Sequence, residues 1–324
     1  MMKKECRLIL DEFMELGECP LWDDREQMLY WVDTDYKRVY SFDPESRKKQ
    51  VFQLDQKTGS IAKENSGSMI CALEDGIYRL NLHNGEKEFI CNPAKDREDN
   101  IYNDGKCDRN GRFWVGTMNI YEKAECGGLY CFRADCGYEE KLGRVTISNG
   151  LAWSGDSRTM YYIDSPTYRI AAFDYDIETE TISNKRTVIA FTKEQGMPDG
   201  MTIDTDGNLW VAMWGGWSIL CCNPYTGEII DRINIPVSNV TSCTFGGRDM
   251  STLYITTARA ELSEKEKKEQ ELEDSNRILN ERNRILSALS RNYTTVLLCD
   301  LKQDTFEVVK GIPLYTMTLK KSNS

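Results

Sequence analysis

Short runs of apolar and aromatic residues, each closed by Asp, Asn or Gly, recur along the chain. Met28–Asp33 is followed by Arg38–Asp43, and the same unit returns as Met160–Asp164 and Arg169–Asp174. Runs rich in β-branched and aromatic residues are typical of β-strands, and the polar residues between them are typical of tight turns. We therefore predict that the chain is built from β-hairpins.

The hairpins repeat at long, regular intervals. Their anchor residues are 40, 44, 47, 49 and 44 positions apart, at Leu29, Met69, Phe113, Met160, Leu209 and Leu253. A repeat of this length, built from strands, indicates a β-propeller in which each unit is one four-stranded blade. Six anchors predict an all-β, six-bladed propeller as a single domain over residues 1–324. The opening run Cys6–Leu10 is expected to add a strand to the last blade and close the ring.

One region departs from the strand pattern. Residues 261–291 are highly charged and rich in helix formers, which predicts a helix inserted into the last blade. Leu272, Leu279 and Leu286 recur every seven residues and would form an apolar stripe. This stripe can pack on the propeller itself or join two copies, so we expect a monomer or a homodimer. Strands over 295–300 and 305–309 are expected to complete the blade.

Composition excludes several classes of function. The formal net charge is -11 and the pI is about 4.9, which disfavours binding to nucleic acid or to an anionic membrane. No apolar run is long enough to span a membrane, and the first residues lack the core of a secretory signal, so we expect a cytoplasmic protein. The single histidine, His83, lies in a predicted turn, which argues against a Ser-His-Asp triad or a His-rich zinc site.

Four turns each combine an oxygen-bearing side chain with a nearby Gly or Pro. Glu18, Asn103, Asn149 and Asp199 precede their strand anchors by 11, 10, 11 and 10 residues. In a fold whose units are related by rotation, a constant offset places all four at one end of the central channel. Glu18, Asn149 and Asp199 offer two carboxylates and an amide oxygen, which suit a hard divalent cation. The pattern predicts one metal site built from distant turns.

The order and spacing of several motifs resemble those of the regucalcin and gluconolactonase family, the senescence marker protein-like lactonases. The motifs are Gly17–Trp22, Asn103–Lys106, Gly111–Met118, Ile147–Ser154, Pro198–Met201, Gly207–Ala212 and Thr241–Gly247. This resemblance extends over residues 7–259. It implies one divalent ion (Ca²⁺, Zn²⁺, Mg²⁺ or Mn²⁺) on Glu18, Asn149 and Asp199, with Asn103 beside it contacting the substrate or a water. It also implies hydrolysis of a sugar-derived lactone or related cyclic ester.

The roles of the remaining residues follow from this chemistry. A metal would polarise the lactone carbonyl, and Asp199 is either the general base for the attacking water or a ligand only. Lys106 is a candidate for binding a substrate anion or a structural lysine, and Trp214 a candidate for the pocket mouth or the blade core.

One position departs from the family pattern. Ile101 stands where an Arg is common, and an aliphatic side chain cannot replace a guanidinium, so the identity of the lactone stays open. Two alternatives to the enzyme stay open as well. One is a propeller that binds calcium or senses a ligand without turnover, and the other is a scaffold that uses residues 261–291 to engage a partner.

Overall fold

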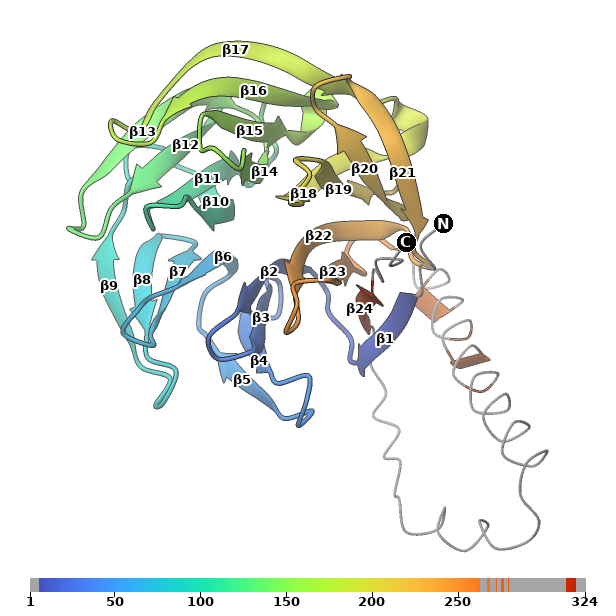
Figure 1. The fold of residues 1–324 in the computed structure, drawn as a ribbon. Coiled ribbons are helices and arrows are strands. Elements are labelled where there is room, and N and C mark those ends of the chain that lie inside the picture. The colour runs from blue at the N-terminus through green and yellow to red at the C-terminus, as the bar shows by residue number, and fades with distance from the viewer. Residues whose placement is uncertain are drawn as a thin grey trace, which may run out of the picture.

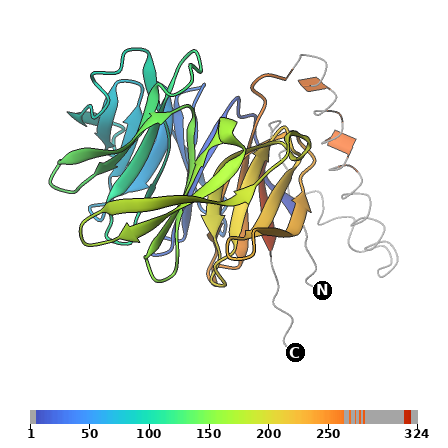
Figure 2. The same ribbon diagram turned by 90° about the horizontal axis from the view of Figure 1, so that it is seen from above.

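The computed structural model describes residues 6–262, 267–268, 272, 275–276, 279 and 313–318. In this part of the chain nearly all regular structure is antiparallel β-sheet, with two single 3-10 turns, η1 (Ser165–Thr167) and η2 (Lys193–Gln195), and helical residues at 267–268, 272, 275–276 and 279. The sheets stand around a central axis (Figure 1), and the view turned by 90° shows the ring edge-on (Figure 2). None of the helices described is long and apolar enough to cross a membrane.

Five blades are each made of four strands that follow one another in the chain. In order they are β2 (Gly17–Asp23), β3 (Met28–Asp33), β4 (Arg38–Phe42) and β5 (Lys49–Gln53); β6 (Thr58–Lys63), β7 (Met69–Leu73), β8 (Gly76–Leu80) and β9 (Lys87–Cys91); β10 (Asn100–Cys107), β11 (Phe113–Asn119), β12 (Gly127–Phe132) and β13 (Tyr138–Val145); β14 (Ser148–Trp153), β15 (Thr159–Asp164), β16 (Arg169–Asp176) and β17 (Thr181–Ala190); β18 (Met197–Ile203), β19 (Leu209–Trp214), β20 (Ser218–Asn223) and β21 (Glu228–Asn234).

The sheet that closes the ring combines the two ends of the chain. β22 (Asn239–Gly246) and β23 (Thr252–Ala258) pair in sequence, and β24 (Pro313–Thr318) and β1 (Cys6–Asp11) complete the order β22-β23-β24-β1. Leu8 of β1 pairs with Tyr315 of β24. The predicted contribution of Cys6–Leu10 to this sheet is confirmed. Closure in this way leaves each blade packed between two neighbours, with no open end to the ring.

These findings correct the predicted fold, a six-bladed propeller with a helix inserted into its last blade. Consecutive strands build five blades, the remaining sheet is a composite of both chain ends, and none of the complete elements of the described residues is an α-helix. Leu272 and Leu279 are 63% and 55% exposed, which contradicts an apolar stripe packed on the propeller. Helix propensity is only a weak guide where no packing surface supports it. Most of 261–291, and the strands expected over 295–300 and 305–309, lie outside the described residues.

The hydrophobic core lies between the blades. Six apolar clusters are each shared by two neighbouring sheets. Successive side chains of a strand point to opposite faces, so one strand serves two clusters. On β3, Leu29 and Trp31 pack toward the closing sheet, whereas Tyr30 and Val32 pack toward the second blade. This explains why the anchor strands are continuously apolar and do not alternate with polar residues.

The innermost strand of every sheet contains a β-bulge. The register shifts after Glu18 in β2, Thr58 in β6, Tyr102 in β10, Asn149 in β14, Pro198 in β18 and Val240 in β22. A bulge adds an unpaired residue, bends the strand and redirects the side chains beside it. Because the bulges recur at matching places, they define one level of the ring near the start of each inner strand.

Candidate metal centre

The four predicted site residues lie at these bulges, on the inner strands of four different blades. Glu18 is on β2, Asn103 on β10, Asn149 on β14 and Asp199 on β18. Asn149 and Asp199 are buried, and Glu18 and Asn103 keep part of their surface exposed. The inner strands contact one another around the axis (Figure 1). The bulges therefore turn side chains that are 46 to 181 residues apart in sequence toward a common region.

Glycines allow these strands to approach closely. A Cβ at Gly150 would lie 2.7 Å from the carbonyl oxygen of Asp199, and a Cβ at Gly200 would lie 2.1 Å from Oγ of Ser242. Contacts this short are sterically forbidden, so only glycine fits at either position. Gly150 therefore lets the backbone at Asp199 lie directly against the strand that carries Asn149.

A chain of hydrogen bonds orients the amide side chains. Asn103 Nδ2 donates to Asn149 Oδ1 at 3.0 Å and to the carbonyl oxygen of Ser148 at 2.8 Å. Asn149 Nδ2 donates to Ser165 Oγ at 2.8 Å, and Ser165 Oγ donates to the carbonyl oxygen of Pro198 at 2.6 Å. These bonds connect the third, fourth and fifth blades. They fix the Asn149 amide so that its nitrogen faces Ser165 and its oxygen faces Asn103.

Three carboxylates interact at this level of the ring. Burial, together with the negative charge of Asp104, raises the pKa of Glu18 to about 8. Burial, followed by the charges of Glu18 and Asp104, raises the pKa of Asp199 well above its ordinary value. Burial also raises the pKa of Asp104, while nearby Lys106 opposes the rise. Like charges held in a poorly solvated region disfavour one another's ionised form.

No positive side chain neutralises this group directly. Among the described residues, no ion pair includes Glu18, Asp104 or Asp199, although other carboxylates such as Glu139 and Glu180 do form ion pairs. Lys106 donates instead to the carbonyl oxygen of Met201 at 2.6 Å. Buried charges are ordinarily paired or bound to metals, so a divalent ion would suit this group.

The donor atoms present fit a hard divalent ion. Two carboxylates and an amide oxygen are the ligand types that Ca²⁺, Mg²⁺ and Mn²⁺ prefer, and Zn²⁺ also accepts carboxylates. When only His, Cys, Asp and Glu are considered, the described residues contain no group of three placed to hold a metal. A metal site here therefore depends on the amide oxygen of Asn149 in addition to Glu18 and Asp199.

The other residues singled out from the sequence, Trp214, Lys106 and His83, lie at different distances from the centre. Trp214 ends β19 opposite Met197, two residues before Asp199, and is half-buried. Lys106 reaches toward β18 through its bond to Met201. His83 is exposed in the turn between β8 and β9, where its backbone N–H donates to Asn81 Oδ1, as its sequence context predicted.

Sequence reasoning missed three residues of the centre. Asp104 follows Asn103 within the same motif, and two adjacent polar residues in a buried strand were the available sign of a bulge. Cys19 adopts the left-handed region with φ 47° and accepts a hydrogen bond from the Ile61 backbone on its sulfur at 3.3 Å. Ser165 comes from η1, a connection whose sequence carries no signal of its role.

Comparisons with known proteins agree with this geometry. The family profile described as SMP-30/Gluconolactonase/LRE-like region matches residues 16–259. A Bacillus subtilis protein named as the sugar lactone lactonase YvrE is 38% identical over 255 residues, which cover 79% of this chain and 87% of that protein.

Solved structures show the same likeness. A luciferin-regenerating enzyme has a TM-score of 0.77 at 35% identity, covering 81% of this chain and 90% of that one. Regucalcin of Agrobacterium tumefaciens, described as a calcium-binding protein, has a TM-score of 0.77 at 25% identity, covering 81% and 88%. The matched profile covers most of the described blades and all four bulge residues of the centre. The chain therefore belongs to the SMP-30/gluconolactonase/LRE-like family.

Proposed function

We propose that the protein is a metal-dependent hydrolase that opens a lactone, either sugar-derived or a related cyclic ester. The observation that carries the proposal is the convergence of Glu18, Asp104 and Asp199, none of which forms an ion pair among the described residues. A similarity to proteins named as lactonases supports the reaction class. The single exposed histidine leaves no side-chain alternative for activating water by a His-based triad.

Glu18, Asn149 and Asp199 would hold one divalent ion, Ca²⁺, Zn²⁺, Mg²⁺ or Mn²⁺. When bound, the ion would supply Lewis-acid polarisation of the lactone carbonyl and a lower pKa for nearby water. Ser165 keeps the Asn149 amide in the orientation that directs its oxygen away from η1. In metal sites, hydrogen bonds from neighbouring residues to the metal-binding side chains fix the orientation of those side chains.

Asp199 is the proposed general base. Its carboxylate takes a proton from water while the water oxygen forms a bond to the carbonyl carbon. The ring C–O bond then breaks, and the departing alkoxide receives the proton, so that lactone and water become a hydroxy acid. Asn103 uses its amide N–H groups on Ser148 and Asn149, which leaves Oδ1 to accept a hydrogen bond from the water or a substrate hydroxyl.

Two further residues complete the proposed substrate contacts. Trp214 lies at the same end of the fifth blade as Asp199 and offers an aromatic face to the substrate ring. Lys106 places a positive charge next to Asp104, where it can also attract a substrate anion.

A second candidate is a propeller that binds calcium, or senses a ligand, without turnover. It is favoured by Ile101, which lacks the guanidinium fork suited to a polyhydroxylated substrate, and by the similarity to a regucalcin described as calcium-binding. The two candidates share the metal centre and differ in whether a lactone is consumed.

A lactone panel separates them. Purified protein is first stripped with EDTA, and each lactone is then followed by acid release after addition of Ca²⁺, Zn²⁺, Mg²⁺ or Mn²⁺ singly. Metal-dependent opening of at least one lactone supports the enzyme. Tight metal binding with no opening of any lactone would instead favour the calcium-binding alternative.

A further inference from the structure

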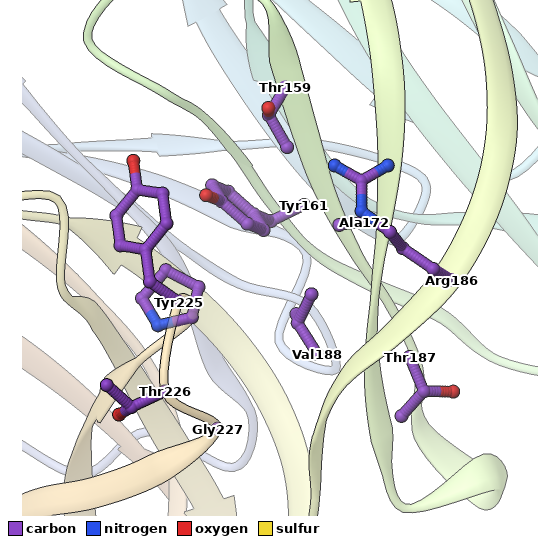
Figure 3. Close-up of a pocket in the computed structure, with 10 residues that line it drawn as sticks. Thr159, Tyr161, Ala172, Arg186, Thr187, Val188, Tyr225, Thr226 and Gly227 are labelled. Carbon is purple, nitrogen blue, oxygen red and sulfur yellow. The ribbon is translucent and has the colours of Figure 1, made fainter.

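A solvent-open cleft of about 400 Å³ lies between the fourth and fifth blades (Figure 3). One wall comes from β15, β16 and β17, and the other from the turn between β20 and β21. A volume of this size is typical of small-molecule sites, which span about 300–1,000 Å³.

The cleft is distinct from the metal centre. Asn149 and Trp153 mark opposite ends of β14, about 13 Å apart at the rise of an extended strand. Trp153 pairs with Met160, the neighbour of the cleft residue Thr159. The cleft therefore opens toward the other end of the blades and toward their outer strands.

Tyr225 gives the cleft an exposed aromatic surface, and the buried Tyr161 lies beside it. Tyr225 is 78% exposed, an unusual position for a large ring, yet its turn is fixed by bonds from the Tyr225 N–H to Asn223 Oδ1 and from the Gly227 N–H to the Asn223 carbonyl. Tyr161 is only 3% exposed, and its pKa rises to about 12 through burial and then the proximity of Tyr225. In Figure 3 the two rings lie side by side, with Arg186 across the cleft.

The polar groups of the cleft carry little net charge. Arg186 Nη1 donates to Asp174 Oδ1 at 2.7 Å, so the guanidinium is already matched by a carboxylate. The cleft also offers the hydroxyls of Thr159 and Thr226, whereas Thr187 pairs with Ala171, which packs toward the third blade, and its side chain points away from the cleft. The cleft thus combines an exposed aromatic face with neutral donors and acceptors and a balanced ion pair.

We propose that this cleft binds a neutral saccharide unit, independently of the metal centre. The C–H face of a sugar ring packs on an aromatic side chain, and its hydroxyls bond to threonine hydroxyls and to the Arg–Asp pair. An anionic sugar acid is disfavoured because Arg186 is neutralised and the whole chain has a net charge of -11.

Isothermal titration with glucose and maltose, with gluconate as the anionic comparison, tests this site. Wild-type protein is expected to bind at least one of the neutral sugars in preference to gluconate. Tyr225→Ala is expected to weaken that binding at least about ten-fold, and Tyr225→Phe, which keeps the ring, by less than about three-fold. Tyr138→Ala removes a tyrosine from β13, outside the cleft, and should change nothing.

A fourth variant separates this site from the proposed function. Asp199→Ala removes a proposed metal ligand and should bind the sugar as the wild type does, even if no lactone is ever found to be hydrolysed. The proposal is overturned if neither neutral sugar binds, if gluconate binds better than both, if Tyr225→Ala binds as tightly as wild type, or if Asp199→Ala abolishes sugar binding.

Discussion

The side-chain amide of Asn103 donates a hydrogen bond to the side-chain oxygen of Asn149 across a distance of 3.0 Å, joining the third blade to the fourth. The two residues are 46 positions apart in sequence. This contact ties the proposed substrate-side residue to a proposed metal ligand. Replacing each of them should therefore have different consequences.

Asn103→Ala should slow hydrolysis more than it weakens metal binding. The variant loses the amide that borders Asn149 and the oxygen proposed to orient water, but it keeps Glu18, Asn149 and Asp199. We expect kcat/KM to fall about 100-fold, as is common when one polar group acting on the reaction is lost, and metal Kd to change by less than about ten-fold. Steady-state kinetics and metal titration on the same preparation test this. Equal fold losses in kcat/KM and in metal affinity would show that Asn103 is itself a metal ligand.

Ser165→Ala should weaken metal binding although Ser165 is not a proposed ligand. Its hydroxyl accepts from Asn149 Nδ2 and donates to the Pro198 carbonyl, so its loss frees the amide to rotate. Loss of such an outer hydrogen bond typically costs 10–100-fold in metal affinity, and we expect about ten-fold. Ser165→Thr, which keeps the hydroxyl, should recover most of it. Unchanged affinity in Ser165→Ala would show that the bond does not orient the ligand.

Ile101→Arg should shift specificity toward polyhydroxylated lactones. Ile101 lies on the same strand as Asn103, two residues before it and at the same end of the third blade. A guanidinium there can bond to substrate hydroxyls bidentately, and we expect the ratio of kcat/KM for an aldonolactone to that for an alkyl-substituted lactone to rise about ten-fold. Tyr36→Arg, at an exposed loop position of the first blade, is the control for added charge alone. If Tyr36→Arg raised the same ratio equally, added charge alone would explain the shift, and position 101 would not contact the substrate.

Glu180 should make stability fall in acid. It lies against Arg112, Arg133 and Lys141, and Arg133 foremost lowers its pKa from 4.5 to about 2. A depressed folded-state pKa stabilises the protein above pH 4.5, and this contribution is lost as pH falls from 4.5 toward 2. Its size is about 2–3 kcal/mol by linkage. Urea unfolding of Glu180→Gln should show lower stability than wild type at pH 7 and a smaller difference at pH 3. If the difference in unfolding free energy between wild type and Glu180→Gln were the same at pH 7 and pH 3, the lowered pKa of Glu180 would not be the cause of the acid dependence.

The strands were largely predictable because their burial leaves a direct mark on the sequence. Leu29 and Val32 lie on opposite faces of one strand and are both fully buried, so the run around them had to be continuously apolar. The repeat of the strands also served to predict the turn residues of the centre. Because the blades are related by rotation, residues at the same offset from their strand anchors lie at the same height along the central axis. That is why the spacing of Glu18, Asn103, Asn149 and Asp199 predicted that they lie at one level of the ring.

Other features had no comparable mark. A bulge depends on the register between strands, and the adjacent polar residues Asn103 and Asp104 were its only sign in the sequence. That sign did not assign Asp104 to the charge cluster of the centre. Ser165 became visible only through its hydrogen bonds to another blade. The helix prediction over 261–291 used propensity and leucine spacing alone, and the exposed Leu272 shows that spacing does not establish a packing surface.

The central claim is that Glu18, Asn149 and Asp199 hold one divalent ion on which lactone opening depends. Its most direct test is a calorimetric metal titration of EDTA-stripped wild type and Asp199→Asn, with hydrolysis of the best lactone assayed at each metal concentration. We predict one ion per chain, activity that rises in proportion to occupancy in the wild type, and loss of both binding and activity in Asp199→Asn. Activity that persists in the stripped wild type, or survives in Asp199→Asn, would contradict this claim.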